Sequence, residues 1–197
     1  AFNLSKKLIK CKHRHLVFTI PSELRSFFRK DRSLLNILFQ AVSQTILSWF
    51  ASQNKKECFT PGFVSTLHTF GRDLKWNPHI HTLISEGAAG NITPWRSIKY
   101  FNFTFLRRAF QKVLLEKLSA HLDVSFKKLK NSLYKKYPDG FYVRAKPDLN
   151  SPKIVIKYIS RYLGRPVIAT SRIDDYDRRF VIFHYTRHED HKTIYEC

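Results

Sequence analysis

Asn77-Pro78-His79-Ile80-His81-Thr82-Leu83-Ile84 is the stretch that decides the fold. Aliphatic and β-branched residues follow Pro78, which is typical of a β-strand. Because side chains alternate between the two faces of a strand, His79 and His81 point to one side and Ile80 points into the opposite layer. Two imidazoles that converge from one strand can serve as paired ligands for a divalent metal. The alternative is that both histidines simply cover a polar face of a sheet.

The segments around this stretch predict a mixture of strands and helices. Residues 63–70 form a strand pattern, and residues 71–77 turn the chain back into the histidine strand, so the two strands are expected to pair as an antiparallel hairpin. Residues 86–91 are expected to end that hairpin in a flexible loop. Other predicted strands cover residues 15–20, 141–145, 167–171 and 180–183, and other predicted helices cover residues 31–52, 105–118, 126–137 and 151–163.

The most informative global property of the chain is its charge. It has 197 residues, 35 Lys plus Arg against 15 Asp plus Glu, and a formal net charge of +20. This excess indicates a polyanionic partner, with nucleic acid favoured over an acidic membrane surface. No apolar run approaches the ~18 residues of a membrane span. The three scattered cysteines predict no disulfide framework, which fits a reducing cytoplasm. Because Met is absent even at residue 1, the chain is expected to be a piece of something longer.

A second pattern lies far downstream, in the predicted helix 151–163. Its core stripe consists of Val155, Ile159 and Leu163, and two tyrosines four residues apart, Tyr158 and Tyr162, lie on the flank of that stripe. A ring at such a position can pack on one side and present its hydroxyl to a cleft. The alternative is a pair of tyrosines at the edge of the core.

Two tyrosines at these positions could act as nucleophiles. A phenol can attack a phosphodiester and hold the DNA end as a covalent ester. Because its pKa is near ~10, phenolate leaves more readily than a sugar alkoxide, so the ester can be passed to a second hydroxyl. A metal held by two histidines would polarise the scissile phosphate.

Three blocks together resemble a known family. They are residues 13–21, residues 70–74 leading into Pro78-His79-Ile80-His81, and residues 145–147 leading into Lys157-Tyr158-Ile159-Ser160-Arg161-Tyr162. In this order they look like the HUH-type two-tyrosine rolling-circle transposases of bacterial insertion sequences, which are related to Helitron enzymes. The resemblance implies an α+β fold with a central antiparallel sheet flanked by α-helices. It also implies a 5′-phosphotyrosine intermediate, a free 3′-hydroxyl, and a divalent metal, Mg²⁺ or Mn²⁺.

The resemblance assigns roles to particular residues. His79 and His81 become metal ligands, and Tyr158 and Tyr162 become nucleophiles. Such enzymes usually carry a third polar ligand, for which Asp73 at the end of the neighbouring strand is the candidate. The alternative is that Asp73 only forms the turn. Relatives commonly carry an N-terminal cysteine-rich zinc module, and this chain has no such cysteine cluster.

His13-Arg14-His15 is also a His-x-His stretch, but its middle residue is charged. Arg14 would face the layer opposite the histidines, so we interpret the stretch as a DNA-contacting or structural strand start. Other basic and aromatic side chains near the proposed site are candidates for binding single-stranded DNA, and either tryptophan can equally be a packing residue. They are Lys157, Arg161, Arg165, Arg172, Trp76 and Trp95.

These observations converge on one hypothesis. Residues 1–12 are expected to be a basic arm or linker end, and residues 13–197 the catalytic domain of a DNA transposase in the bacterial cytoplasm, associated with the nucleoid. It would nick and join single-stranded DNA at transposon ends. One alternative is a non-catalytic single-stranded nucleic-acid-binding module. Others are a nickase of the plasmid replication-initiator or relaxase type, and a hydrolytic nuclease in which water attacks.

Overall fold

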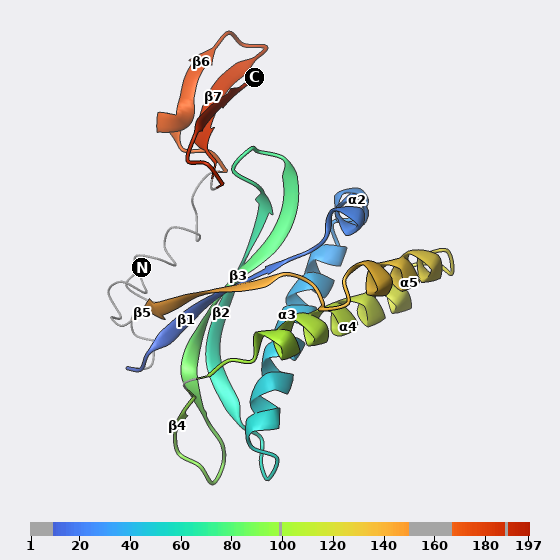
Figure 1. The fold of residues 1–197 in the computed structure, drawn as a ribbon, viewed down its shortest axis with the longest axis vertical. Coiled ribbons are helices and arrows are strands. Elements are labelled where there is room, and N and C mark those ends of the chain that lie inside the picture. Colours follow the sequence, from blue (N-terminus) through green and yellow to red (C-terminus); the bar gives the residue numbers. More distant parts are fainter. Residues whose placement is uncertain (1–9, 99, 150–166, 188) are drawn as a thin grey trace.

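The computed structural model describes residues 10–98, 100–149, 167–187 and 189–197 (Figure 1). The first part contains β1 (His13–Thr19), α2 (Ser22–Lys30), α3 (Leu34–Gln53), β2 (Thr60–Phe70) and β3 (Trp76–Ala89). Then follow β4 (Arg96–Ser97), α4 (Phe103–His121), α5 (Phe126–Lys136) and β5 (Val143–Leu149). The last part contains a 3₁₀ turn (Thr170–Arg172), β6 (Ile173–Tyr176), β7 (Val181–Thr186) and β8 (Thr193–Glu196).

The central sheet has the strand order β2-β3-β1-β5, and the short β4 pairs with the far end of β3. Every neighbouring pair is antiparallel. The first strand of the chain therefore inserts between the histidine strand and β5, rather than lying at an edge. This arrangement confirms the α+β class with a central antiparallel sheet.

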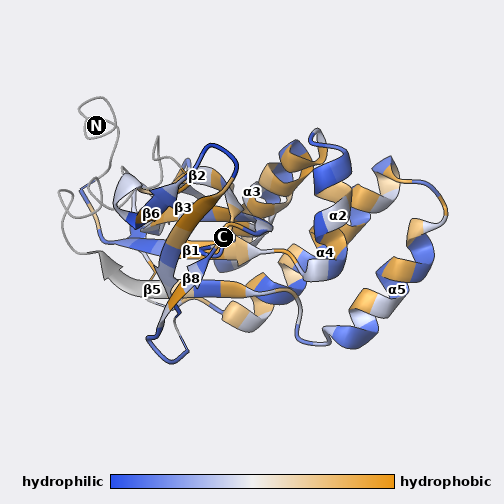
Figure 2. Cartoon of the chain, turned by 90° about the horizontal axis from the view of Figure 1, so that it is seen from above, coloured by the Kyte–Doolittle hydropathy of each residue, from blue (hydrophilic) through white to orange (hydrophobic). Residues whose placement is uncertain are grey.

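One face of this sheet supports the hydrophobic core. Leu16 and Phe18 of β1, Ile80 and Ile84 of β3, and Val143 of β5 are all almost fully buried. Helices α2, α3 and α4 cover this face, and in Figure 2 the helices lie together on one side of the sheet. The strand residues that alternate with these core positions face the opposite side of the sheet, which α2, α3 and α4 do not cover.

Helix α3 is long and apolar enough to cross a membrane by length and composition alone. In this fold it is the central core helix, because Leu38, Val42, Ile46 and Phe50 are all buried against the sheet and α4. Burying such a stripe explains the hydropathy of the segment without a bilayer.

A second, three-stranded antiparallel sheet with the order β6-β7-β8 projects beyond the turn between β2 and β3 (Figure 1). Arg172 fastens it there: its Nε donates to the carbonyl of His184 at 2.7 Å and its Nη2 to the carbonyl of Arg72 at 2.6 Å. The Nη1 of Arg72 donates in turn to the carbonyl of Thr186 at 3.1 Å. The hairpin turn and the second sheet are thus joined by charge-assisted hydrogen bonds.

The structure corrects three expectations of local structure. Residues 86–89 continue β3 instead of opening a loop, because β2 and β4 pair with them on both sides. The predicted strand 167–171 is a bend and a 3₁₀ turn, and the strand begins only at Ile173, where pairing with β7 becomes possible. Strand β8 was not expected at all. The predicted helix 151–163 lies outside the described residues.

Candidate metal centre

Cross-strand register collects histidines from different strands on the open face of the central sheet. His68 of β2 lies directly opposite His79 of β3, and Thr66 lies opposite His81. On the other side of β3, Thr19 pairs with His79 and Val17 with His81. Residues directly opposite one another share a face, so these side chains point the same way.

His68, His79 and His81 form a compact triad. One ring nitrogen from each lies within 4.8 Å of the others, and their ring centroids are 4.6 to 5.6 Å apart. All three are partly buried. Among the described residues this is the one group of three or more His, Cys, Asp or Glu side chains that could hold a metal ion.

The local environment of His79 favours a neutral imidazole. Burial lowers its pKa, the charges of His68 and Arg25 lower it further, and only the contact with the Asn77 carbonyl opposes them. The Nδ1 lies 2.7 Å from that carbonyl oxygen, which can only accept, so Nδ1 carries the proton. This fixes Nε2 as the bare nitrogen, the atom that a metal ligand needs.

His15 contacts the triad from β1. Its Nε2 lies 2.8 Å from Nδ1 of His81, and the two ring planes are within 5° of parallel. Parallel rings stacked face to face cannot bring two nitrogens this close, because van der Waals contact keeps stacked planes ~3.5 Å apart. The rings therefore lie nearly edge to edge and share an N–H···N hydrogen bond.

The histidine face opens into a cavity of about 460 Å³. Three arginines line it, namely Arg72 from the hairpin turn, Arg144 from β5 and Arg172 from the 3₁₀ turn. No carboxylate is among its described lining residues. Such a cationic cavity around three imidazoles suits an anion that also ligates a metal.

Tyr158 and Tyr162 lie outside the described residues, as do Lys157, Arg161 and Arg165. Their flanking residues are described on both sides. Arg144, before this segment, and Val167, five residues after Tyr162, both line the histidine cavity. The histidine cavity is thus lined by residues that precede and follow the two tyrosines in the sequence.

The third candidate ligand, Asp73, is not part of the triad. It lies in the turn between β2 and β3, where its Oδ1 accepts from the backbone N–H of Lys75 at 3.2 Å and its Oδ2 lies 3.6 Å from the ammonium of Lys75. Sequence reasoning missed His68 instead. The signal was present, since the predicted hairpin places residue 68 across from residue 79 once its register is fixed.

Three candidate DNA-binding side chains lie among the described residues, namely Arg172, Trp76 and Trp95, and the Trp95 ring lies against Gly87 of β3. Arg172 lines the histidine cavity while holding the second sheet. Trp76 lines a neighbouring cavity of about 540 Å³ together with Arg29 and Arg32, and Phe70 lines both cavities. The Trp76 Nε1–H donates to the Arg25 carbonyl at 2.9 Å, and the Arg32 guanidinium lies 5.2 Å from the ring centre. Trp76 therefore has a packing role already.

Arg14 faces the core side of the sheet, opposite His13 and His15, as strand alternation requires. Its charge is compensated there, because Nε lies 2.7 Å from Oε1 of the buried Glu86 and the guanidinium lies 5.0 Å from the Phe101 ring centre. The structural interpretation of this strand start thus holds for Arg14. His15 of the same stretch lies on the opposite face, where it contacts His81 of the triad.

Comparison with known proteins gives this geometry a context. A family model described as "Putative transposase", Y2_Tnp, matches residues 62–196. "Putative transposase y4qJ" of Sinorhizobium fredii is 26% identical over 208 residues, covering 95% of this chain and 52% of that protein. "Transposase for insertion sequence element IS801" of Pseudomonas savastanoi pv. phaseolicola is 26% identical over 186 residues, covering 87% of this chain and 44% of that protein. The chain thus spans about half the length of these relatives.

Among solved structures, the conjugative relaxase TrwC, in a metal-free complex with OriT DNA, aligns with a TM-score of 0.39 and 16% identity. The alignment covers 63% of this chain and 57% of the relaxase. The family model matches more than half of the chain, and its match spans both the hairpin that carries the histidines and the segment that carries the two tyrosines. The chain therefore belongs to the two-tyrosine transposase family, Y2_Tnp.

Proposed function

We propose that this chain is the catalytic part of a transposase that nicks and rejoins single-stranded DNA at transposon ends, through tyrosine attack beside a bound divalent metal. One observation carries the proposal. Three imidazoles converge in a cavity whose described lining includes Arg144, which precedes the tyrosine segment in the sequence, and Val167, five residues after Tyr162. A segment tethered on both sides to one cavity can deliver its phenols there.

The donor set of the triad fits a divalent cation. His68, His79 and His81 offer imidazole nitrogens, and at least His79 is held neutral with Nε2 bare. A divalent ion bound there, Mg²⁺ or Mn²⁺, would polarise the scissile phosphate and offset the charge that develops on it. We therefore propose His68 as the third ligand in place of Asp73, whose carboxylate contacts Lys75 in the turn.

His15 has a positioning role in this proposal. A ring nitrogen that binds metal must be unprotonated, so a His81 that ligates through Nε2 keeps its proton on Nδ1. That proton is then donated to Nε2 of His15, 2.8 Å away. The same hydrogen bond fixes the plane of the His81 ring, because the two rings are within 5° of parallel.

The covalent step belongs to Tyr158 and Tyr162. The phenol of one tyrosine loses its proton as its oxygen attacks phosphorus, the bond from phosphorus to the 3′ oxygen breaks, and that oxygen gains a proton to leave as a free 3′-hydroxyl. The 5′ phosphate remains esterified to the tyrosine. Attack by a second 3′-hydroxyl reverses the exchange and releases the phenol, so joining needs no external energy source. Two tyrosines allow two strand ends to be held in turn.

Basic side chains around the cavity would hold the strand in place. Arg72, Arg144 and Arg172 line the cavity, and Lys157, Arg161 and Arg165 alternate with the tyrosines along the sequence. Phosphate contacts of this kind position a strand without reading its sequence. These basic side chains would hold the scissile phosphate next to the triad.

The test is a covalent-adduct assay. The protein is incubated with a labelled single-stranded oligonucleotide carrying a transposon end, with Mg²⁺, Mn²⁺ or EDTA, and run on a denaturing gel. We expect a metal-dependent protein–DNA adduct that is reduced in Tyr158→Phe or Tyr162→Phe and absent from the double variant. Tyr195→Phe is the matched control, since Tyr195 is 66% exposed on the second sheet.

Other outcomes of the same gel distinguish the alternatives. Cleavage that persists in the double tyrosine variant without any adduct would mean that water is the nucleophile. Salt-sensitive binding without metal dependence, cleavage or adduct would reduce the protein to a nucleic-acid-binding module. An undiminished adduct in the double variant would reject both tyrosines as nucleophiles.

A further inference from the structure

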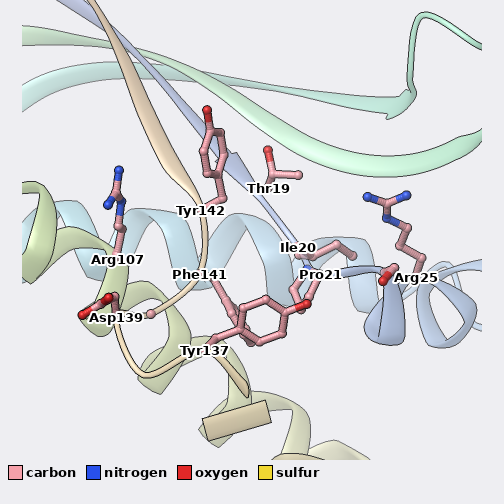
Figure 3. Close-up of a pocket in the computed structure, with 11 residues that line it drawn as sticks. Thr19, Ile20, Pro21, Arg25, Arg107, Tyr137, Asp139, Phe141 and Tyr142 are labelled. Carbon is pink, nitrogen blue, oxygen red and sulfur yellow. The ribbon is translucent and has the colours of Figure 1, made fainter. Parts of the chain in front are cut away.

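A second basic pocket lies beside the histidine cavity, where α2, α4 and the beginning of β5 meet (Figure 3). Its volume is about 500 Å³, within the ~300–1,000 Å³ range of ligand-binding clefts. Apolar lining residues include Ile20, Pro21 and Phe141, and the rings of Tyr137 and Tyr142 complete the lining. Nothing in the proposed chemistry at the triad uses this pocket.

Two arginines line the pocket from different helices. Arg25 comes from α2 and Arg107 from α4, and in Figure 3 their guanidinium groups lie on opposite sides of Tyr142. Each has a buried Nε without a hydrogen-bond partner among the described residues. A buried donor left unpaired costs free energy, which an anionic acceptor would recover.

The charge balance of the pocket favours an anion. Asp139 is the one acidic residue in its described lining, and its carboxylate is 80% exposed and lies 3.4 Å from Arg108 outside the pocket. The positive charges of Arg25 and Arg107 are therefore not neutralised within the pocket. Arginine is the side chain best suited to phosphate, because its planar donors match phosphate oxygens.

The pocket is continuous with the metal centre. Thr19 and Tyr142 line both cavities. Thr19 is also the cross-strand neighbour of His79. A strand whose phosphate lies at the triad would therefore reach the second pocket past Thr19 and Tyr142.

We propose that the Arg25–Arg107 pocket binds the nucleotides of the single strand that flank the cleaved phosphodiester. This inference rests on the proposed function, which brings a DNA strand to the triad. The two arginines neutralise successive phosphates on either side of the pocket, and Tyr142, 53% exposed, offers a face on which an unpaired base stacks. The apolar residues below Tyr142 exclude water from that base.

The test measures single-strand binding separately from cleavage. Fluorescence anisotropy with a labelled single-stranded oligonucleotide is recorded in EDTA over a series of salt concentrations. We expect Arg25→Gln and Arg107→Gln each to weaken binding and to lower the slope of log affinity against log salt by ~0.7–1, the value for one lost phosphate contact on a single strand.

Each arginine has a matched control on the same helix. Lys30→Gln on α2 and Lys112→Gln on α4 remove one exposed positive charge without altering the pocket lining. We expect both controls to change the slope less than the arginine variants do. Equal salt slopes in the control and arginine variants would show that the pocket is not a specific binding site and that the protein attracts the strand only by its overall positive charge.

Tyr142 provides a second, independent readout. Tyr142→Ala should weaken oligonucleotide binding by about tenfold, whereas Tyr142→Phe keeps the stacking face and should bind like the wild type. Mn²⁺ affinity measured by calorimetry should be the same in Tyr142→Ala, Tyr142→Phe and wild type. Equal loss in the Ala and Phe variants would reject stacking on this ring.

The outcomes keep this inference apart from the proposed function. If the wild type forms the metal-dependent adduct but the arginine variants bind like their controls, the pocket is not a strand-binding site and the transposase chemistry still stands. Conversely, a wild type that gives no adduct, while Arg25→Gln and Arg107→Gln still lower the salt slope, would retain the pocket as a strand-binding site and reject the chemistry.

Discussion

Nε2 of His15 lies 2.8 Å from Nδ1 of His81, and the two rings are nearly coplanar. A side chain from the first strand of the chain thereby sets the orientation of a proposed metal ligand 66 residues further on. Partners of this kind typically contribute ~10–100-fold to metal affinity. The first prediction tests whether this one does.

His15→Ala should lower Mn²⁺ affinity by ~10–100-fold, because the His81 ring loses the acceptor that fixes its tautomer and plane. His15→Gln should restore much of the loss, since a Gln carbonyl oxygen can accept the same proton. Titration calorimetry measures both, with the exposed His121→Gln as control. Equal affinity in His15→Ala and wild type would show that the hydrogen bond does not serve the metal.

The second prediction separates the two candidates for the third ligand. His68→Ala should reduce Mn²⁺ affinity more than His15→Ala does, because it removes one of three imidazoles in the triad. Asp73→Asn should leave the affinity within about twofold, because its carboxylate serves the turn through Lys75. Calorimetry under the same conditions decides. The reverse ranking would return Asp73 to the ligand set.

The third prediction concerns acid stability. Lys136 lies 2.6 Å from Oε1 of Glu23 and, as the main cause, holds the pKa of that carboxyl at about 2 instead of its ordinary 4.5. Since the folded-state pKa is the lower one, the stabilisation is complete above about pH 4.5 and disappears as the pH falls toward 2. Lys136 is 62% exposed, so solvent screening keeps the contribution of this pair to stability small.

Glu23→Gln should therefore lower the melting temperature at pH 7. The difference in melting temperature between the variant and the wild type should become smaller as the pH approaches 2. Thermal unfolding followed by circular dichroism at several pH values measures this. Glu116→Gln is the control, because its 54%-exposed carboxylate lies 3.9 Å from Lys112 in an (i, i+4) pair on the surface of α4. A difference from wild type that stays constant with pH would exclude the Glu23–Lys136 pair as its source.

The fourth prediction concerns the turn that leads into β5. Gly140 has φ +88°, and a Cβ there would collide with the backbone of Arg107. This close approach lets the Phe141 N–H donate to the Arg107 carbonyl at 3.2 Å. Gly140→Ala should destabilise the fold by more than ~1 kcal/mol in urea unfolding, whereas the exposed neighbour Asp139→Ala should stay within ~0.5 kcal/mol. Similar changes in the free energy of unfolding for both variants would show that the turn can accommodate a Cβ at residue 140.

Local sequence patterns and composition were sufficient to predict much of the secondary structure, the class of partner and the family of this protein. Alternation along a strand was enough to place His79 and His81 on one face, and the apolar periodicities predicted the core helices α3 and α4 within a few residues. The charge of +20 indicated a nucleic-acid partner, and three short blocks indicated the family to which the chain belongs. Each of these signals is contained in a short window or in the composition, so no contact between distant residues was needed.

Only the tertiary structure decided which side chains join the two histidines. The register of the β2–β3 hairpin selects His68 over Asp73, and the insertion of β1 beside β3 brings His15 to His81. The approach of α2, α4 and β5 likewise places Arg25 and Arg107 in one pocket. Such choices depend on hydrogen bonding and packing between segments far apart in the chain, and side-chain periodicity within one segment carries no information about its neighbours in space.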